Sequence, residues 1–313
     1  MIIVKYCGGL GNQMFQYAMQ LVLTKMYDNQ EIKGEKYHYF LENEHNGFEL
    51  TNYFGIDINM ATKKEVRKVY NGIIPNALYS KLPLKIKRGI LLKYQYIYLN
   101  LMNKILKNKS MKVINDEKHN NYVEKIHDLG NGDWYLRGLW QRVDYFEKNR
   151  QDILNAFPLK CEISFEEKEI VTKLKNGQYI AVHVRGGDFM NSKFNLCDAN
   201  YYERAIKEIN DENLPLVVFT DDEKYSKKLL EKFNIAYYIS HDIDNSIVDM
   251  YMLSMAKKVI VSNSTFAFWG AYLSEIENQE VICPKYATWD GSCYRLFTQR
   301  NFWKVLDNSK KEV

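Results

Sequence analysis

The sequence has few cysteines, and their positions exclude the common cysteine-based sites. The five of them stand far apart in a chain of 313 residues, at Cys7, Cys161, Cys197, Cys283 and Cys293. Because their number is odd and no two form a C-x-x-C pair, neither a disulfide framework nor a zinc site is expected. Unpaired thiols favour a cytoplasmic location. No run of about 18 apolar residues is present, so we expect no membrane span, and the opening apolar run is too short for a signal peptide.

Acidic residues are nearly missing from one stretch of the chain. Between Lys63 and Lys112 there are 13 lysines and arginines but a single acid, Glu65. This stretch therefore carries +12, and since the whole chain carries +4, the remainder carries −8. Such asymmetry is typical of a surface that faces an anionic partner.

The basic stretch interleaves its cations with Leu, Ile and Tyr, as interfacial helices do. It predicts contact with anionic lipid at the inner face of the plasma membrane. A basic helical subdomain with one solvated face is the alternative. A nonenzymatic binder of polyanions is a third hypothesis, but the sequence has no recognisable nucleic-acid-binding motif, and we expect no nucleic acid as partner.

The second half alternates apolar β-rich runs with helical patterns, which predicts βαβ units and a doubly wound parallel sheet. The predicted strands are 179–184, 216–220, 236–240, 258–262 and 280–283, and the predicted helices between them are 200–210, 223–233, 246–257 and 265–275.

The first half is less regular. We predict a strand at Ile2–Tyr6 and a helix at Asn12–Tyr27, and we expect the aromatic segment 134–146 to pack between the halves. A boundary near Pro158 gives a first domain, 1–158, that includes a basic helical segment, 60–112, and a second domain, 159–313.

Three glycines within four positions, in "CGGLGNQ" at 7–13, separate the first strand from the first helix. Gly9 and Gly11 match a dinucleotide fingerprint, but Met14 stands where its third glycine belongs, and no acid clearly ends a second strand. A glycine turn still presents backbone N–H groups and the positive end of a helix dipole to an anion. A tight turn without a ligand is the alternative.

The segment "HVRGGD" at 183–188 ends the first strand of the second half. Alternation along the strand puts His183 and Arg185 on one side of it. An arginine at a strand end beside glycines suits a phosphate, because the guanidinium donates two parallel hydrogen bonds. In the ligand-free alternative, Arg185 pairs with Asp188.

A second polar loop, "VSNSTFAFWG" at 261–270, follows another strand of the same sheet. Helix capping explains one or two of its polar residues. Anion binding would account for a run of four, namely Ser262, Asn263, Ser264 and Thr265.

Three acids are candidates for contacts with a base or ribose: Asp221 and Asp222, which end the strand "VVFT", and Asp249 in "IVDMYML". Solvated surface acids are the alternative. The Asp-x-Asp pair in "HDID" at 241–244 lacks a supporting cluster of ligands, so we predict no metal site.

Taken together, "GGLGNQMFQYA", "HVRGGD", "FTDD" and "SNSTFAFWGAYL" resemble the α-1,2-fucosyltransferases of glycosyltransferase family 11, from Met1 to about Trp289. The resemblance implies an α/β, GT-B-like fold in which two Rossmann-like domains face each other across a cleft. It makes 1–158 the acceptor-side domain and 159–313 the domain that binds GDP-fucose. It implies inverting transfer of L-fucose from GDP-β-L-fucose to the 2-hydroxyl of a terminal β-galactoside, without metal or cofactor. The product would belong to a surface polysaccharide or O-antigen, and the acceptor could be lipid-linked. An α-1,6- or protein O-fucosyltransferase, which shares the H-x-R logic, is the nearest alternative.

The resemblance also implies roles for single residues. Arg185 would hold the donor pyrophosphate, His183 would shape the nucleotide pocket, and Asp249 would recognise guanine. Thr265 would contact a phosphate, and Asn12 would reach the β-phosphate. The predicted catalytic residues are Arg185, Asp188 and His183, and the predicted donor-binding residues are Gly9, Gly11, Asn12, His183, Arg185, Asp221, Asp249, Ser262, Asn263, Ser264 and Thr265.

The motif "HVRGGD" also contains a candidate base and a departure from the family's usual pattern. Asp188 is our candidate for the general base, with Asp198 as an alternative. The family usually has H-x-R-R-G-D, and here Gly186 takes the place of the second arginine. We expect activity to survive this change, with an effect on donor affinity or acceptor preference.

Overall fold

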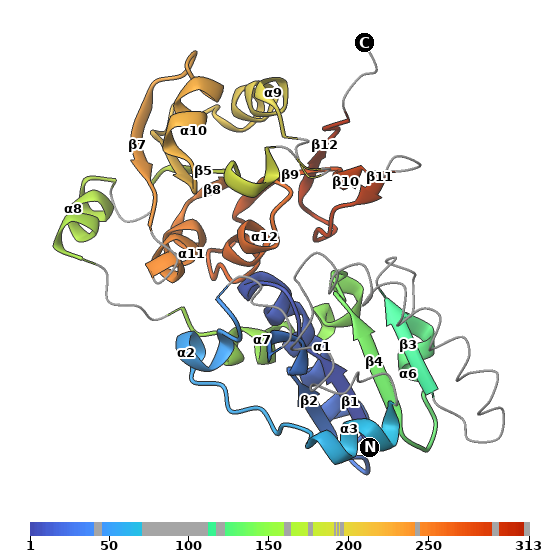
Figure 1. Ribbon diagram of the computed structural model, residues 1–313. Coiled ribbons are helices and arrows are strands. Elements are labelled where there is room, and N and C mark those ends of the chain that lie inside the picture. Colours follow the sequence, from blue (N-terminus) through green and yellow to red (C-terminus); the bar gives the residue numbers. More distant parts are fainter. Residues whose placement is uncertain are drawn as a thin grey trace, which may run out of the picture. The chain divides into compact units, whose positions relative to one another are not determined.

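The computed structural model describes residues 1–40, 46–70, 112–116, 123–159, 164–174, 178–190, 192, 194, 197–241, 245–289 and 294–309. The chain divides into two compact units, Met1–Ile153 and Leu154–Val313, each with its own parallel sheet (Figure 1). The predicted α/β class with two Rossmann-like units is confirmed. Most of the predicted basic helical segment, from residue 71 to 111, lies outside the described residues.

The second unit contains a six-stranded sheet in which every neighbouring pair is parallel. Its order is β12-β9-β8-β5-β6-β7. The strands are β5 (Ile180–Val184), β6 (Leu216–Thr220), β7 (Ile235–Ile239), β8 (Lys258–Ile260), β9 (Glu280–Pro284) and β12 (Lys304–Leu306). The chain builds outward from β5 in one direction and then returns to add β8 on the other side. The point of reversal, between β5 and β8, is where doubly wound sheets bind ligands at the strands' carboxyl ends.

Helices cover both faces of this sheet (Figure 1). The pair α9 and α10 lies on one face, and the pair α11 and α12 on the other. The bounds are α8 (Phe165–Lys173), α9 (Ala199–Ile209), α10 (Glu223–Leu229), α11 (Ser246–Met255) and α12 (Thr265–Tyr272). The short helix η4 (Gly187–Phe189) follows β5, and a hairpin of β10 (Tyr286–Trp289) and β11 (Tyr294–Leu296) follows β9.

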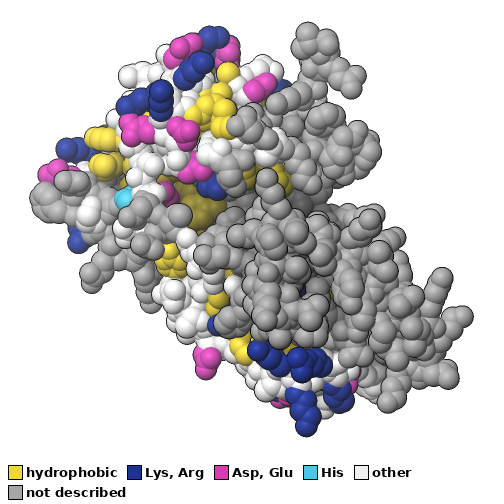
Figure 2. Space-filling view, viewed as in Figure 1, with side chains coloured by type: hydrophobic (Ala, Val, Ile, Leu, Met, Phe, Trp, Pro, Cys, Tyr) yellow, Lys and Arg dark blue, Asp and Glu magenta, His cyan; other side chains and the backbone are white. Residues whose placement is uncertain are grey.

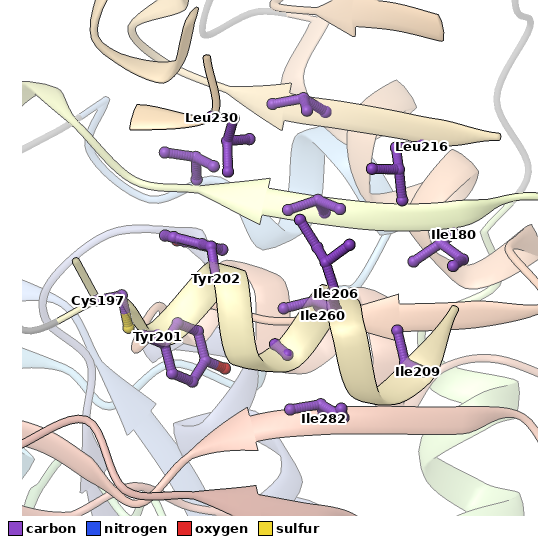
Figure 3. Packing of buried hydrophobic residues seen from close by; sticks show 14 residues of the cluster. Ile180, Cys197, Tyr201, Tyr202, Ile206, Ile209, Leu216, Leu230, Ile260 and Ile282 are labelled. Carbon is purple, nitrogen blue, oxygen red and sulfur yellow. The ribbon is translucent and has the colours of Figure 1, made fainter. Parts of the chain in front are cut away.

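The core of the second unit forms where α9 packs on the sheet (Figure 3). Ile180, Leu216, Ile260 and Ile282 come from four neighbouring strands and lie under the helix. The helix buries one stripe, at Tyr201, Tyr202, Ala205, Ile206 and Ile209, which is the spacing of a single helical face. Strands β5, β6 and β8 are buried throughout, and β9 is buried at all but its first residue, so these strands are almost continuously apolar. The edge strand β7 is partly exposed but also apolar in sequence. This is why the sequence pattern located all five strands to within two residues.

The first unit contains a four-stranded parallel sheet in the order β2-β1-β4-β3. Its strands are β1 (Ile2–Lys5), β2 (Ile32–Glu35), β3 (Lys112–Asp116) and β4 (Trp134–Gly138). Its helices are α1 (Leu10–Met26), η1 (Tyr37–Phe40), α2 (Leu50–Phe54), α3 (Lys63–Val69), α6 (Val123–His127), η2 (Val143–Tyr145), η3 (Glu147–Asn149) and α7 (Arg150–Ala156), which continues into the second unit. The chain reverses here between β1 and β4.

Two expectations for the first unit were wrong. Residues 134–138 of the aromatic segment form β4, which pairs with β1 and β3 inside the sheet instead of packing between the halves. An acid does end the second strand, because Glu35 is the last residue of β2. Its buried carboxylate accepts hydrogen bonds from the Tyr135 hydroxyl (2.5 Å) and the Tyr37 N–H (2.8 Å). Both of its oxygens therefore contact the protein's own groups.

Within the described residues, no helix is both long enough and apolar enough to cross a bilayer.

Candidate functional site

The loops after β5 and β8 meet at the reversal point of the second sheet. His183 lies in β5 and Ser262 follows β8, and the His183 Nδ1 atom lies 2.9 Å from the Ser262 Oγ atom. The Tyr202 hydroxyl of α9 donates to the His183 carbonyl at 3.0 Å. The polar groups that the sequence placed at two strand ends are therefore brought together, as the strand order requires.

His183 is uncharged in this site at neutral pH. Burial lowers its pKa from 6.5 to about 3, and the positive charge of Arg185 contributes in the same direction. A neutral imidazole adds no positive charge to a phosphate site, and a base with so low a pKa accepts protons poorly at pH 7. The ring can therefore shape a pocket and make hydrogen bonds, but it is poorly suited to carrying a proton.

The low pKa of His183 predicts a loss of stability in mild acid. Between pH 6.5 and 3 the unfolded chain binds a proton at this residue and the folded chain does not, so stability falls as the pH falls. Between pH 7.5 and 5.5 the free energy of unfolding should drop by about 1.4 kcal/mol from this residue alone. Urea titrations of the native chain and of His183→Gln at both pH values would measure it. An equal drop in both proteins would contradict the assignment.

Arg185 is held by Asp221, the residue that directly follows the neighbouring strand β6. The Arg185 Nη1 atom lies 2.8 Å from Asp221 Oδ2, and the Gly186 N–H donates to Asp221 Oδ1 at 2.7 Å. One carboxylate thus fixes both the guanidinium and the turn that follows it. The Arg185 and Asp221 side chains remain about one third exposed, at 32% and 29%. The alternative in which Arg185 pairs with Asp188 is not tested, because the side chain of Asp188 lies outside the described part of the structure; its backbone belongs to η4.

Gly186 has no room for a side chain. A Cβ atom there would lie 2.7 Å from the Asp222 Cβ atom and 3.2 Å from Tyr225 Cδ1. Asp222 is itself fixed, because its carboxylate accepts a hydrogen bond from the Tyr225 N–H (2.9 Å) at the start of α10. A glycine at position 186 is therefore required by how closely this turn packs on the loop after β6.

The polar residues of the loop after β8 have different roles. Asn263 supports the fold: its Nδ2 donates to the carbonyls of Phe194 and Ala287, both at 2.7 Å, and its Oδ1 accepts from the Cys197 thiol. Ser264 is the N-cap residue of α12, yet no described side chain caps this helix by a hydrogen bond. Thr265, its first residue, is partly exposed. Capping therefore does not explain the run of hydroxyls.

Asp249 is buried in the first turn of α11, and its partner comes from the loop after β7. The His241 Nδ1 atom lies 2.5 Å from Asp249 Oδ1. In the sequence, His241 stands out only as the neighbour of the Asp-x-Asp pair, whose residues lie outside the described part of the chain. Within the described residues, no group of three or more His, Cys, Asp or Glu side chains is arranged to hold a metal ion.

The glycine turn of the first unit is built around its own helix. Gly8 has φ +78°, and a Cβ atom there would lie 2.5 Å from Asn12 Nδ2, so the missing side chain makes room for the Asn12 amide. Gln13 and Gln16 of α1 donate back to the carbonyls of Gly8 (3.0 Å) and Cys7 (3.2 Å). Gly9 is the N-cap residue of α1, and no described side chain caps the helix there. Gly11 lies in the first turn of the helix. These contacts hold the turn rigidly.

Comparison with known proteins shows which family the chain matches and which proteins it is similar to. The model of the family described as Glycosyl transferase family 11 matches residues 1–290. The O-antigen biosynthesis glycosyltransferase WbnK of Escherichia coli is 27% identical, over 89% of this chain and 92% of the relative. An Alpha-1,2-colitosyltransferase of Escherichia coli is 26% identical, over 90% and 91%. Among solved structures, the fucosyltransferase NodZ from Bradyrhizobium is similar with a TM-score of 0.45 and 12% identity, over 86% of this chain and 91% of that one.

Proposed function

Because the chain belongs to glycosyl transferase family 11, we propose that it moves L-fucose from GDP-β-L-fucose to the 2-hydroxyl of a terminal β-galactoside during O-antigen or surface polysaccharide synthesis. The family match covers nearly the whole chain and supports the reaction class. The names of the two Escherichia coli relatives support the O-antigen setting and the α-1,2 linkage. The name of the second relative suggests an alternative donor sugar, colitose, which is L-fucose without its 3-hydroxyl.

The main support for the proposed donor site is that Arg185, His183 and the loop 262–265 lie together at the reversal point of the second sheet. A partly exposed guanidinium there suits a pyrophosphate. The neutral His183 would border the nucleotide, and Asp249, fixed by His241, would accept hydrogen bonds from guanine. Asp221 would act through Arg185 and not as a nucleotide ligand, since its carboxylate contacts that residue and the Gly186 N–H.

The proposed mechanism is a single displacement with inversion. The acceptor hydroxyl attacks the anomeric carbon, the bond to GDP breaks, and the hydroxyl proton passes to a base. Negative charge grows on the β-phosphate as GDP leaves. Arg185, Thr265 and the Asn12 amide would stabilise that charge through fixed hydrogen-bond donors, which is the role a divalent metal has in other transferases. The proposed reaction therefore needs no metal.

Asp188 is proposed as the base, on its position in the motif. The alternative, Asp198, is the N-cap residue of α9 and accepts a hydrogen bond from the Tyr201 N–H at 3.0 Å. Asp188→Asn should lower kcat about a hundredfold, the lower end of what a positioned base contributes, with GDP affinity unchanged. Single-turnover rates and calorimetric titration with GDP measure the two effects. Turnover close to that of the native chain would remove the assignment.

The test of the reaction is release of GDP from GDP-fucose, in the presence of EDTA, with a panel of β-galactosides that includes lactose and N-acetyllactosamine. Release that depends on one acceptor, with product linked at the galactose 2-hydroxyl, supports the proposal. GDP-colitose in a parallel series identifies the donor sugar, because preference for it would replace fucose. If the chain neither releases GDP from GDP-fucose nor binds GDP, the proposed donor site is contradicted. Salt-sensitive binding of nucleic acid in its place would favour a polyanion binder. Product linked at another position would favour a different fucosyltransferase.

A membrane partner is proposed on the charge of α3. Its Lys63, Lys64, Arg67 and Lys68 are exposed, while Val66 and Val69 face the core. Figure 2 shows Lys and Arg side chains gathered near the bottom of the view, where Figure 1 places α3. Anionic lipid at the inner face of a membrane would attract this surface, and a lipid-linked acceptor would be found there. Sedimentation with vesicles that contain or lack anionic lipid tests the idea, and equal sedimentation with both would remove it.

A further inference from the structure

The carboxyl ends of β1 and β4 lie side by side at the reversal point of the first sheet. The glycine turn follows β1, and residues 139–142 follow β4. The Gln16 amide joins the two loops, because it donates both to the Cys7 carbonyl (3.2 Å) and to the Gly138 carbonyl (3.3 Å). Residues separated by more than 120 positions in the chain thus form one edge of the unit.

The Asn12 amide is fixed in one direction at this edge. Its Oδ1 accepts a hydrogen bond from Gln141 Nε2 at 2.6 Å. With the oxygen used in this way, the nitrogen is the half of the amide that faces outward. It lies over Gly8, in the space that a Cβ atom would fill. Among the described residues, none makes a hydrogen bond with Asn12 Nδ2.

Gln141 is itself held firmly. The residue is only 7% exposed, and the residue before it, Trp140, is fully buried with φ +54°. A bulky residue in this left-handed region is uncommon and persists only where its surroundings determine it. The Trp140 ring packs edge-on against Tyr145 (5.7 Å between centroids), and its carbonyl accepts from the Arg142 N–H at 2.8 Å. The backbone that carries Gln141 is therefore locked on both sides.

We infer that Gln141 is a positioning residue that turns the Asn12 amide so that its N–H bonds face an anionic oxygen of the bound sugar nucleotide. The inference rests on the proposed function, in which Asn12 meets the donor. The amino end of α1, with its positive dipole end and no side-chain cap, adds to the attraction for an anion. Without Gln141 the amide would be free to turn its oxygen toward the phosphate, where a lone pair repels negative charge.

Two substitutions of Gln141 separate direction from packing. Gln141→Leu removes the donor, and we expect kcat with GDP-fucose to fall about tenfold. Gln141→Glu keeps the shape but accepts from Asn12 Nδ2, so the amide reverses and kcat should fall about a hundredfold. Gln30→Glu is the matched control: it adds the same charge to the same unit, in the loop before β2 at the opposite edge of the sheet, and should leave kcat unchanged.

A double-substitution cycle with Asn12→Ala decides whether Gln141 acts through Asn12. We expect Gln141→Leu to change kcat and the GDP dissociation constant by less than twofold once Asn12 is alanine, because neighbouring residues in one interaction are not additive. Losses that multiply in the double variant would overturn the inference while leaving the proposed function standing. If the native chain neither binds GDP nor releases it from GDP-fucose, the proposed function fails, and the inference fails with it.

Discussion

Arg185→Ala should lower kcat/KM for the sugar nucleotide about a thousandfold, since it removes a charged, two-pronged donor from the place where the leaving group gains charge. The fold should survive. Arg185 and Asp221 are both about one third exposed, and ion pairs of this kind contribute about 1 kcal/mol or less to stability. Asp221 would also keep its hydrogen bond from the Gly186 N–H. Steady-state kinetics, GDP titration and a thermal melt measure the three quantities.

Two further variants make this result specific. Arg185→Lys keeps the charge but loses the planar fork, so its activity should lie between that of Arg185→Ala and that of the native chain. Arg204→Ala removes an exposed arginine from α9 of the same unit, where its guanidinium donates to the Asp307 carbonyl. It should leave kcat/KM unchanged. Activity of Arg185→Ala within a few fold of the native chain would show that the pyrophosphate binds elsewhere.

Gly186→Arg, which restores the family's usual motif, should lower activity at least a few hundredfold instead of raising it. The new Cβ atom would meet the Asp222 Cβ atom at 2.7 Å, so the turn or the loop after β6 must move. Overpacking of this kind costs about 1–3 kcal/mol. The same turn carries Arg185, and a displacement of about 1 Å in a positioned group can cost a hundredfold in rate. Kinetics and a thermal melt of the variant check both effects.

The cause can be isolated with smaller changes. Gly186→Ala already introduces the clashing atom without a charge, so it should lose activity as well. Asp222→Gly removes the opposing Cβ atom and weakens the cap of α10 by only about a few tenths of a kcal/mol. Combined with Gly186→Arg, it should recover part of the activity. A gain of activity in Gly186→Arg alone would mean that the missing charge, and not the packing, governs this position.

The second unit was the more predictable half because four of its strands, β5, β6, β8 and β9, are almost completely buried. Uniformly apolar runs such as Ile180–Val184 stand out from the polar helices between them. The strands that the sequence did not reveal are partly exposed or short, as β12 is, or carry mixed residues, as β4 does with Arg137. Aromatic residues in β4 suggested a packing surface, although the strand is internal to its sheet.

The site was predictable to the level of which loops meet, and no further. Strand ends at β5 and β8 follow from the strand order, so His183 and the loop 262–265 were placed together correctly. The partners that fix the functional groups come from elsewhere. Asp221 could have been found as the partner of Arg185, since β5 and β6 are consecutive strands of one βαβ unit. The pairs His241–Asp249 and Gln141–Asn12 have no spacing signal, because each depends on how a loop bends after its strand.

The position of β1 has a consequence for how the chain emerges from the ribosome. Ile2, Ile3 and Val4 are fully buried, and the strand needs β2 on one side and β4 on the other. β4 begins about 130 residues later in the chain, and at roughly 5–20 residues per second it is synthesised about 7–26 s after β1. During that interval the edge of the apolar strand β1 that later pairs with β4 is exposed. The nascent chain is therefore a natural client for holding chaperones, and fragments that end before Gly138 should aggregate.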